Sequence, residues 1–124
     1  MAWPMSEART PWPTEIRLKQ DRRALAVTFD DGIAHELPAE MLRVLSPSAE
    51  VQGHSPEQRV TVPGKKDVRI IGVDPVGNYA VKLTFDDGHN TGLFSWVYLR
   101  RLGDERETLW AAYVAELAAK GMAR

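Results

Sequence analysis

The pentapeptide Thr-Phe-Asp-Asp-Gly occurs twice in this chain, and this repeat limits what the chain can fold into. Its copies lie at residues 28–32 and 84–88, an offset of 56 residues. Each copy ends a stretch of alternating apolar and small or polar residues, which is typical of a strand with one buried face. Asp-Gly after such a strand favours a two-residue hairpin turn, because both residues tolerate positive φ. Each copy is therefore predicted to belong to a β-hairpin followed by a short helix.

The match between the two halves continues beyond the turns. It pairs Leu37 with Leu93 and, after a one-residue insertion, Leu42 with Leu99, Arg43 with Arg100 and Leu45 with Leu102. Pro38 suits the first position of a helix, where a missing N–H costs nothing. Ser95 is expected to cap the second helix, and Gly103 to end it in a left-handed conformation. Two copies are too few for a solenoid, so we expect two similar units on a shared core.

Three further segments complete the expected fold. Residues 15–18 and 68–73 are predicted strands, and Asp74-Pro75 is expected to end the second one. Residues 46–67 are rich in Ser, Pro, Gly and polar groups and are expected to form a loop, in which Val60 and Val62 could pair as a short strand. Apolar residues at helical spacing between Leu109 and Leu117 predict an amphipathic C-terminal helix. A capping box formed by Asp104 and Glu107 is expected to begin that helix.

The predicted fold class is α+β: a twisted, mainly antiparallel sheet from two related β-hairpin/short-helix units, with the C-terminal amphipathic helix packed on it. Residues 1–13 hold three of the eight prolines and are expected to be a disordered leader, with Met5 as an alternative start to Met1. The domain is expected to span residues 14–120. The expected core consists of Ile16, Leu18, Leu25, Val27, Phe29, Leu42, Val68, Ile70, Val81, Leu83, Phe85, Phe94, Trp96, Leu99, Trp110, Tyr113 and Leu117.

Composition excludes several classes of function. The chain has no cysteine, so disulfides, zinc–thiolate sites and a cysteine nucleophile are impossible. Its 16 basic and 17 acidic side chains give a net charge of −1, which argues against a nucleic-acid partner. No apolar run approaches the roughly 20 residues that cross a bilayer. The N-terminus lacks the pattern of a secretory signal, so the expected location is the cytoplasm.

No group of residues has the spacing of a catalytic or metal site, and we expect no enzyme activity. The paired aspartates could bind a cation or act as general acid and base, but their bonding to the turn backbone explains them more simply. The three histidines, His35, His54 and His89, fall on a strand end, a loop and a hairpin tip without ligand spacing. No serine lies in a Gly-x-Ser-x-Gly elbow.

A local basic stretch precedes the second unit. It consists of Arg59, Lys65, Lys66 and Arg69. Such a stretch is typical of a solvated strand edge protected by lysine. Contact with a polyanion or a partner is the alternative.

Four runs of the chain resemble the gamma-butyrobetaine hydroxylase-like N-terminal domain family, a domain of unknown function. They are residues 37–54 (LPAEMLRVLSPSAEVQGH), 74–81 (DPVGNYAV), 85–89 (FDDGH) and 96–99 (WVYL). The resemblance covers about residues 14–118. Members of this family occur as small standalone bacterial proteins, as the N-terminal domain of carnitine-pathway 2-oxoglutarate oxygenases, and fused to iron–sulfur carrier ATPases.

In the oxygenases this domain binds structural zinc through Cys-x-Cys-x-x-Cys and one distant histidine. The resemblance places these ligands at Ser46, Ser48, Val51 and His89. Serine and valine cannot replace thiolate, so the zinc function is not expected to carry over and no cofactor is expected. The same loop must then be held by packing and hydrogen bonds. The iron and 2-oxoglutarate residues of the oxygenases belong to a catalytic domain outside this resemblance.

We therefore expect a non-catalytic binding or adaptor module that acts with another protein. The expected surface combines two polar, histidine-bearing loops: Gln52, Gly53, His54 and Gln58 in the central loop, and Asp86, Asp87, His89 and Asn90 at the second hairpin tip. The alternative is an accessory role in iron or iron–sulfur cluster metabolism, with transient metal contact through His54 and His89. The fusions found in the family suggest that alternative.

Overall fold

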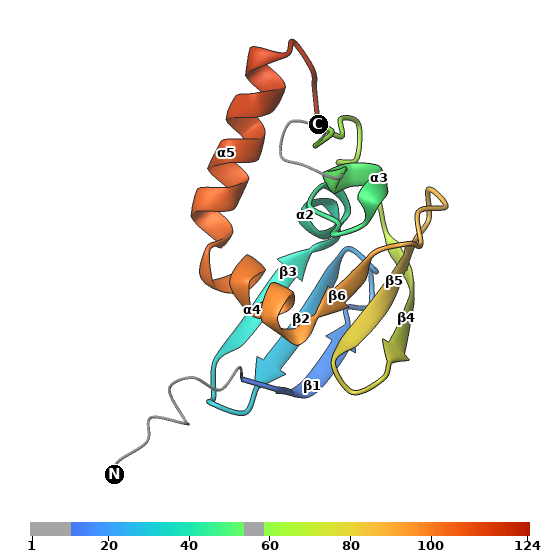
Figure 1. The fold of residues 1–124 in the computed structure, drawn as a ribbon, viewed down its shortest axis with the longest axis vertical. Helices are drawn as coiled ribbons and strands as arrows, with labels where there is room; N and C mark the ends of the chain where they lie inside the picture. Colours follow the sequence, from blue (N-terminus) through green and yellow to red (C-terminus); the bar gives the residue numbers. More distant parts are fainter. Residues whose placement is uncertain (1–10, 54–58) are drawn as a thin grey trace.

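The structure is a computed structural model that describes residues 11–53 and 59–124 (Figure 1). Its elements are β1 (Pro13–Leu18), β2 (Ala24–Phe29), β3 (Ala34–Pro38), α2 (Ala39–Val44), α3 (Ala49–Gln52), β4 (Ile70–Val76), β5 (Ala80–Phe85), β6 (Leu93–Ser95), α4 (Trp96–Asp104) and α5 (Arg106–Ala119). Two three-stranded antiparallel sheets form, in the orders β1-β2-β3 and β4-β5-β6. This architecture confirms the α+β class.

The repeat in the sequence is a repeat in the structure. We call β1–β3 with α2 the first unit, and β4–β6 with α4 the second unit. In the first unit Pro13 lies opposite Phe29, and in the second Ile70 lies opposite Phe85. The strand register shifts directly after each of these pairs, so both units carry a β-bulge at the same place.

The two Asp-Asp-Gly segments form three-residue hairpin loops, not the two-residue turns that we predicted. In the first loop the N–H of Gly32 donates to the carbonyl of Phe29, and the N–H of Phe29 donates to the carbonyl of Ile33. Phe85, Gly88 and His89 repeat both bonds in the second loop. Only the glycine of each loop has a positive φ, 87° for Gly32 and 93° for Gly88. The aspartates therefore keep ordinary backbone conformations, and glycine alone supplies the left-handed residue.

One correspondence between the units differs from the prediction. Leu37 pairs with Leu25, and the equivalent partner of Val81 is Phe94, not Leu93. Leu37 and Phe94 are both fully buried, whereas Leu93 is 44% exposed. The one-residue insertion thus lies in the second hairpin, before β6, because only that placement keeps the buried face in phase.

Two crossed ion pairs join equivalent positions of the two units. Asp31 in the first hairpin loop lies 2.8 Å from Nη1 of Arg100 in α4. Asp87 in the second hairpin loop lies 2.8 Å from Nε of Arg43 in α2. Since Arg43 and Arg100 are equivalent positions, the two units exchange the same contact across a pseudo-two-fold relation.

The end of α4 differs from the prediction. Gly103 lies inside the helix and is buried, and it does not adopt the expected left-handed conformation. A Cβ atom there would lie 2.1 Å from the His35 ring, so the glycine serves close packing between the units. Asp104 also belongs to α4 and accepts hydrogen bonds from Arg100 and contacts His35, instead of capping the last helix. The N-cap of α5 is Glu105, which makes no side-chain capping bond.

Other segment boundaries also differ from the predicted ones. Strand β4 continues through Asp74 and Pro75, because an edge strand tolerates the missing N–H of proline. The expected central loop contains the short helix α3, while Val60 and Val62 lie outside the strands. Pro38 is the N-cap of α2. Trp12 and Pro13, assigned to the leader, belong to the fold, while residues 1–10 lie outside the described residues.

A single core lies between the two units. The expected core residues are buried, except that Ile16, Leu18, Trp96 and Trp110 are only partly buried. Ser95 caps α4 as predicted, since its hydroxyl accepts from the N–H of Tyr98. Helix α5 lies to one side of the molecule (Figure 1), where the Tyr113 hydroxyl donates to the carbonyl of Val62.

Candidate functional site

Ser46, Ser48, Glu50 and His89 form a cluster that joins the second hairpin loop to α3. The hydroxyl of Ser46 lies 2.9 Å from Nε2 of His89, and that of Ser48 lies 3.5 Å from the same nitrogen. On the other side of the ring, Nδ1 lies 3.0 Å from Oε2 of Glu50. Three of the four positions named by the family resemblance therefore converge on one imidazole, although 41 or more residues separate His89 from the serines.

The ring of His89 is held in its neutral form. Burial and the nearby guanidinium of Arg43 lower the pKa of His89, and the Glu50 carboxylate offsets them only in part. A carboxylate can only accept, so Nδ1–H donates to Glu50 and the bare Nε2 accepts from the Ser46 hydroxyl. The His89 cluster is thus a neutral hydrogen-bonded clasp around the segment between α2 and α3.

The bonding order Ser46–His89–Glu50 is that of a serine hydrolase triad, and its burial decides against that use. Ser46 is 0% exposed and His89 is 6% exposed. A nucleophile must reach a substrate carbonyl, and a Cβ on Gly92 would already meet the Ser46 hydroxyl at 2.3 Å. The buried arrangement therefore stabilises the fold and does not present Ser46 to a substrate.

The His89 cluster does not fit the zinc that the family resemblance implies. The four positions named by the resemblance supply one imidazole and two neutral hydroxyls, while Val51 is a buried hydrocarbon. Glu50 adds a carboxylate to the cluster, but it lies on the Nδ1 side of the ring, away from the serines on Nε2. Structural zinc needs four nitrogen or thiolate ligands. Among residues 11–53 and 59–124, no group of three or more His, Asp or Glu side chains could hold a metal ion.

The structure describes only part of the expected binding surface. Gln52 and Gly53 end α3, while Asp86 and Asn90 are exposed in the second hairpin, next to the His89 cluster. Asp87 is engaged internally: burial opposes its ionisation, but hydrogen bonds from Lys65, the His89 N–H and Arg43 lower the pKa of Asp87 to about 2. His54 and Gln58 lie outside the described residues.

The residues of the basic stretch do not act together. Lys65 pairs with Asp87, and Arg59 pairs with Glu116 in α5. The stretch is therefore divided between two regions of the molecule.

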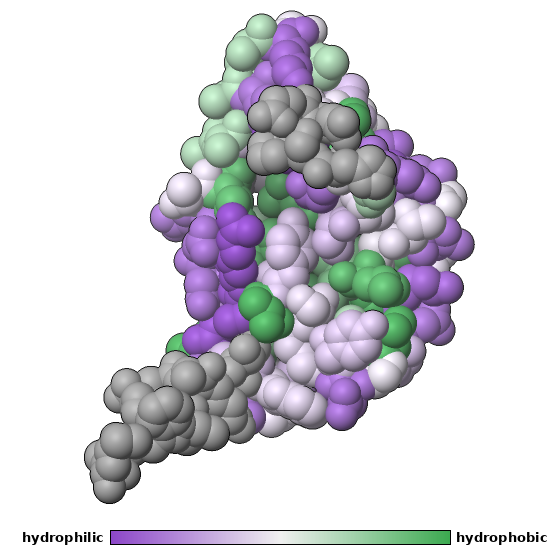
Figure 2. Space-filling view, viewed as in Figure 1, coloured by the Kyte–Doolittle hydropathy of each residue, from purple (hydrophilic) through white to green (hydrophobic). Residues whose placement is uncertain are grey.

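Several apolar side chains of the second unit are exposed, and no sequence pattern indicated them. Tyr79, Leu93 and Val97 are 53%, 44% and 59% exposed, and we call them the apolar patch. The carbonyl of Tyr79 accepts from the N–H of Trp96, which places Tyr79 beside the start of α4. Figure 2 shows hydrophobic side chains among polar ones in this part of the molecule.

The equivalent positions of the first unit are charged, and one of them is covered: the Glu36 side chain is exposed, whereas Glu40 is buried. Glu36 and Glu40 correspond to Leu93 and Val97. Arg106, at the start of α5, donates to the carbonyl of Glu36 at 2.9 Å. Glu40 is 6% exposed and binds Arg124 through two hydrogen bonds of 2.7 and 2.9 Å, and that guanidinium lies over the Trp110 ring of α5. Helix α5 and the residues after it therefore cover the Glu40 position of the first unit, whereas the equivalent Val97 of the second unit is uncovered.

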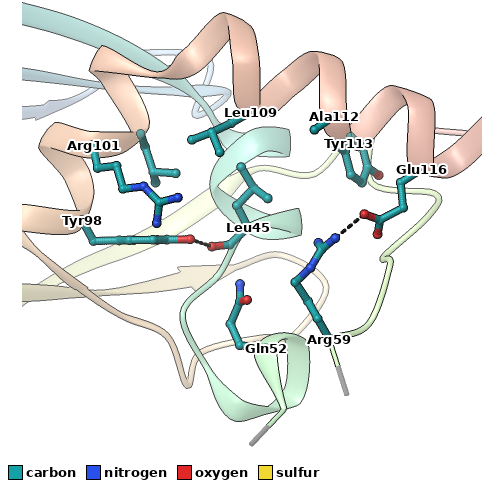
Figure 3. Close-up of a pocket in the computed structure, with 10 residues that line it drawn as sticks. Leu45, Gln52, Arg59, Tyr98, Arg101, Leu109, Ala112, Tyr113 and Glu116 are labelled. Carbon is teal, nitrogen blue, oxygen red and sulfur yellow. Dashed lines mark hydrogen bonds and ion pairs between the residues drawn. The ribbon is translucent and has the colours of Figure 1, made fainter. Parts of the chain in front are cut away.

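A pocket of about 190 Å³ lies between α3, α4 and α5 (Figure 3). Gln52, Arg59, Tyr98 and Arg101 surround it, together with residues of α5. Of these, only Gln52 belonged to the expected surface. No sequence pattern indicated Tyr98 and Arg101, because they converge only when α4 packs beside α5.

Comparison with known proteins gives one family and several similar structures. The model of the gamma-butyrobetaine hydroxylase-like N-terminal family matches residues 16–100. Two NMR solution structures are 47% and 48% identical, with TM-scores of 0.80 and 0.81; they cover 94% and 95% of this chain, which covers 91% and 88% of theirs. A crystal structure of a protein with unknown function of the DUF971 family, from Acidithiobacillus ferrooxidans, is 45% identical with a TM-score of 0.61, over 73% of this chain and 91% of its own.

A search of the curated proteins found no match. Within the described residues, no helix has the length and apolar character needed to span a membrane.

Proposed function

This chain belongs to the gamma-butyrobetaine hydroxylase-like N-terminal domain family, and we propose that it serves as a non-catalytic adaptor module that binds another protein. The apolar patch on the second unit carries the proposal. A cluster of exposed apolar side chains on a small protein is typical of a protein interaction site. Aromatic residues such as Tyr79 are enriched among those that contribute most to binding.

The first unit indicates what kind of partner fits the patch. There, α5 lies against the equivalent surface through Trp110 and Arg106. The second unit has the same hairpin and helix, and its patch replaces two glutamates with Leu93 and Val97. We infer that the partner presents an amphipathic helix whose apolar side covers these residues.

The hairpin part of the expected polar surface adjoins the apolar patch in the chain. The second hairpin loop, with Asp86 and Asn90 exposed, leads through Gly92 directly into Leu93. We propose that these polar residues form the rim of the interface, where hydrogen bonds select the partner. The hydrophobic centre and polar rim follow the common anatomy of protein interfaces.

The test compares partner recovery by three forms of the protein, purified at equal amounts from native lysate. The double variant Leu93→Glu/Val97→Glu should reduce the recovered partner by about tenfold or more, because two charges would be buried in the interface. Ile33→Glu is the matched control, since Ile33 is 41% exposed on the first hairpin. It should leave recovery unchanged.

Crosslinking then locates the partner's contact. A photoreactive p-benzoylphenylalanine at position 97 should label a helical segment of the recovered partner, and the same group at position 33 should not. Equal recovery by all three forms, or equal labelling from both positions, would overturn the proposal.

An accessory role in iron or iron–sulfur cluster metabolism is the alternative proposal. It requires transient metal contact, for which His89 offers a ring that is neutral but buried. Elemental analysis of protein purified without a histidine tag, followed by titration with iron or cobalt, separates the two. Stoichiometric metal favours the accessory role, while metal-free protein that keeps its partner in chelator favours the adaptor.

A further inference from the structure

The pocket between α3, α4 and α5 has an apolar floor and a charged rim, a combination that nothing in the adaptor proposal uses. Leu45, Leu102 and Leu109 contribute hydrocarbon, and the rings of Tyr98 and Tyr113 complete the floor. The pocket's volume of about 190 Å³ equals that of about six water molecules at roughly 30 Å³ each. It therefore suits a ligand group of about six to ten heavy atoms.

Positive and hydrogen-bonding partners already balance the negative charge of Glu116, the carboxylate at the rim. Glu116 accepts from Arg59 and from the hydroxyl of Thr61, and Lys120 donates to that hydroxyl at 2.6 Å. Burial opposes ionisation of Glu116, but the Thr61 and Arg59 contacts outweigh it and lower the pKa of this carboxyl below its ordinary value. Glu116 thus remains ionised, and its charge is matched by its own partners.

Arg101 is the rim cation that a ligand can recruit at low cost. Its only ion pair among the described residues is with Glu105, at 3.4 Å, and both side chains are half exposed. Such exposed pairs contribute little, about 0–1 kcal/mol, so exchanging one carboxylate for another is nearly free. Figure 3 shows the Arg101 guanidinium above the ring of Tyr98, facing the pocket.

The local charge favours an anion. Among the residues that line the pocket, Arg59 and Arg101 carry two positive charges and Glu116 carries one negative charge. Both arginines are close enough to Tyr98 to act on its hydroxyl, since burial raises the pKa of Tyr98 and Arg101 and Arg59 oppose that rise. Two guanidiniums thus converge over an apolar floor.

We propose that this pocket binds a carboxylate with a short apolar body. The hydrocarbon lies against the leucines, and the carboxylate bonds to Arg101 at the rim, as guanidinium–carboxylate geometry favours. Such a group has two sources: a free short-chain acid, or the C-terminal residue of a polypeptide. None of the patch residues Tyr79, Leu93 and Val97 lines the pocket, so the proposal does not rest on the adaptor proposal.

Titration of the ¹⁵N-labelled protein, followed by amide chemical shifts, tests the proposal. Hexanoate represents the free acid and N-acetyl-leucine represents a C-terminal residue, while hexanamide and N-acetyl-leucinamide are their neutral counterparts. At least one acid should shift the amides of Tyr98, Arg101 and Ala112 saturably. Its neutral counterpart should bind about tenfold more weakly or worse, because it lacks the charge-assisted bond.

Two variants assign the effect to the pocket. Arg101→Gln removes the charge from an exposed helical position and should weaken binding of the acid by about tenfold. Arg17→Gln, on exposed β1, should leave it unchanged. Preference for hexanoate identifies a free acid, and preference for N-acetyl-leucine identifies a polypeptide terminus. Absence of saturation with both acids, equal binding of acid and amide, or equal loss in both variants would overturn the proposal.

Discussion

Gly103→Ala should destabilise the protein, although alanine is the better helix former. Gly103 lies in α4, and a Cβ there would meet Cδ2, Cγ and Nε2 of His35 at 2.1, 2.3 and 2.7 Å. The ring cannot simply move away. Its Nε2 lies 2.9 Å from Asp104, and the ring packs edge-to-face with Phe29, with 6.4 Å between ring centroids.

The magnitude follows from two opposing contributions. Replacing glycine by alanine inside a helix favours folding by about 0.8–1 kcal/mol. Forcing a methyl group into a closely packed contact costs about 1–3 kcal/mol, and displacing the ring loses the bond between His35 and Asp104, about 1 kcal/mol more. The net loss is about 1–3 kcal/mol, and each kcal/mol lowers Tm by about 3–6 °C in a chain of this size.

Urea unfolding followed by circular dichroism measures this loss in a double-mutant cycle. In the His35→Ala background the clash is absent, so Gly103→Ala should raise the free energy of unfolding by up to about 1 kcal/mol. The sign of the effect therefore reverses between the two backgrounds. If Gly103→Ala stabilises the otherwise unchanged protein, or has the same effect in both backgrounds, the close-packing argument is refuted.

Three other predictions concern the second hairpin loop and the segment that His89 holds. His89→Gln should cost about 1–3 kcal/mol through the lost bonds to Ser46 and Glu50. It should also flatten the pH profile of stability. Because the folded pKa of His89 lies below its ordinary 6.5, its contribution is full above pH 6.5 and is lost as the pH falls through the folded value; an unchanged profile would contradict this. Asp87→Asn should leave Arg43 unpaired and cost about 1–3 kcal/mol, and acid titration should then lack the loss of stability between about pH 4 and pH 2 that the wild-type carboxylate causes. EDTA should leave the Tm of the protein unchanged, since Ser46, Ser48 and Val51 offer no thiolate; a lower Tm in calorimetry would reveal a structural metal.

The repeat made most of the fold predictable, because hairpin pairing is local and has a period of two. The strand faces of Leu25, Val27 and Phe29 follow from alternation alone, and they are repeated at Val81, Leu83 and Phe85. The insertion could not be placed this way. Leu93 and Phe94 are both apolar, and only the pairing of β5 with β6 decides which of them is buried.

Helix ends were predicted wrongly where contacts between the units override local signals. Glycine after the last apolar residue of a helical pattern usually ends the helix, and Asp followed by Glu three residues later usually begins one. Here Gly103 makes room for His35, and Asp104 bonds to His35 and Arg100. In both cases the observed structure depends on His35, a residue about 70 positions away that no local pattern includes.

The candidate sites also differ in how much of each could be predicted from the sequence. The resemblance to a family located Ser46, Ser48 and His89, because their positions follow from a motif. Neither the apolar patch nor the pocket has a motif. The patch is recognisable only because the α5 region buries Glu40 and leaves the equivalent Val97 exposed, and the pocket exists only where three helices meet.

The crossed pairs of Asp31 with Arg100 and Asp87 with Arg43 resemble the interface of a two-fold dimer whose subunits have been joined. In each unit, the aspartate of the hairpin loop pairs with the arginine of the other unit and not with its own. Two separate copies of one unit would therefore have to associate in solution to form these pairs, and they would separate on dilution. The connecting segment removes that dependence by holding the halves at a high effective concentration. It also ends the equality of the two halves: in a true dimer every surface change occurs twice, whereas in the joined chain one copy can remain under α5 while the other diverges.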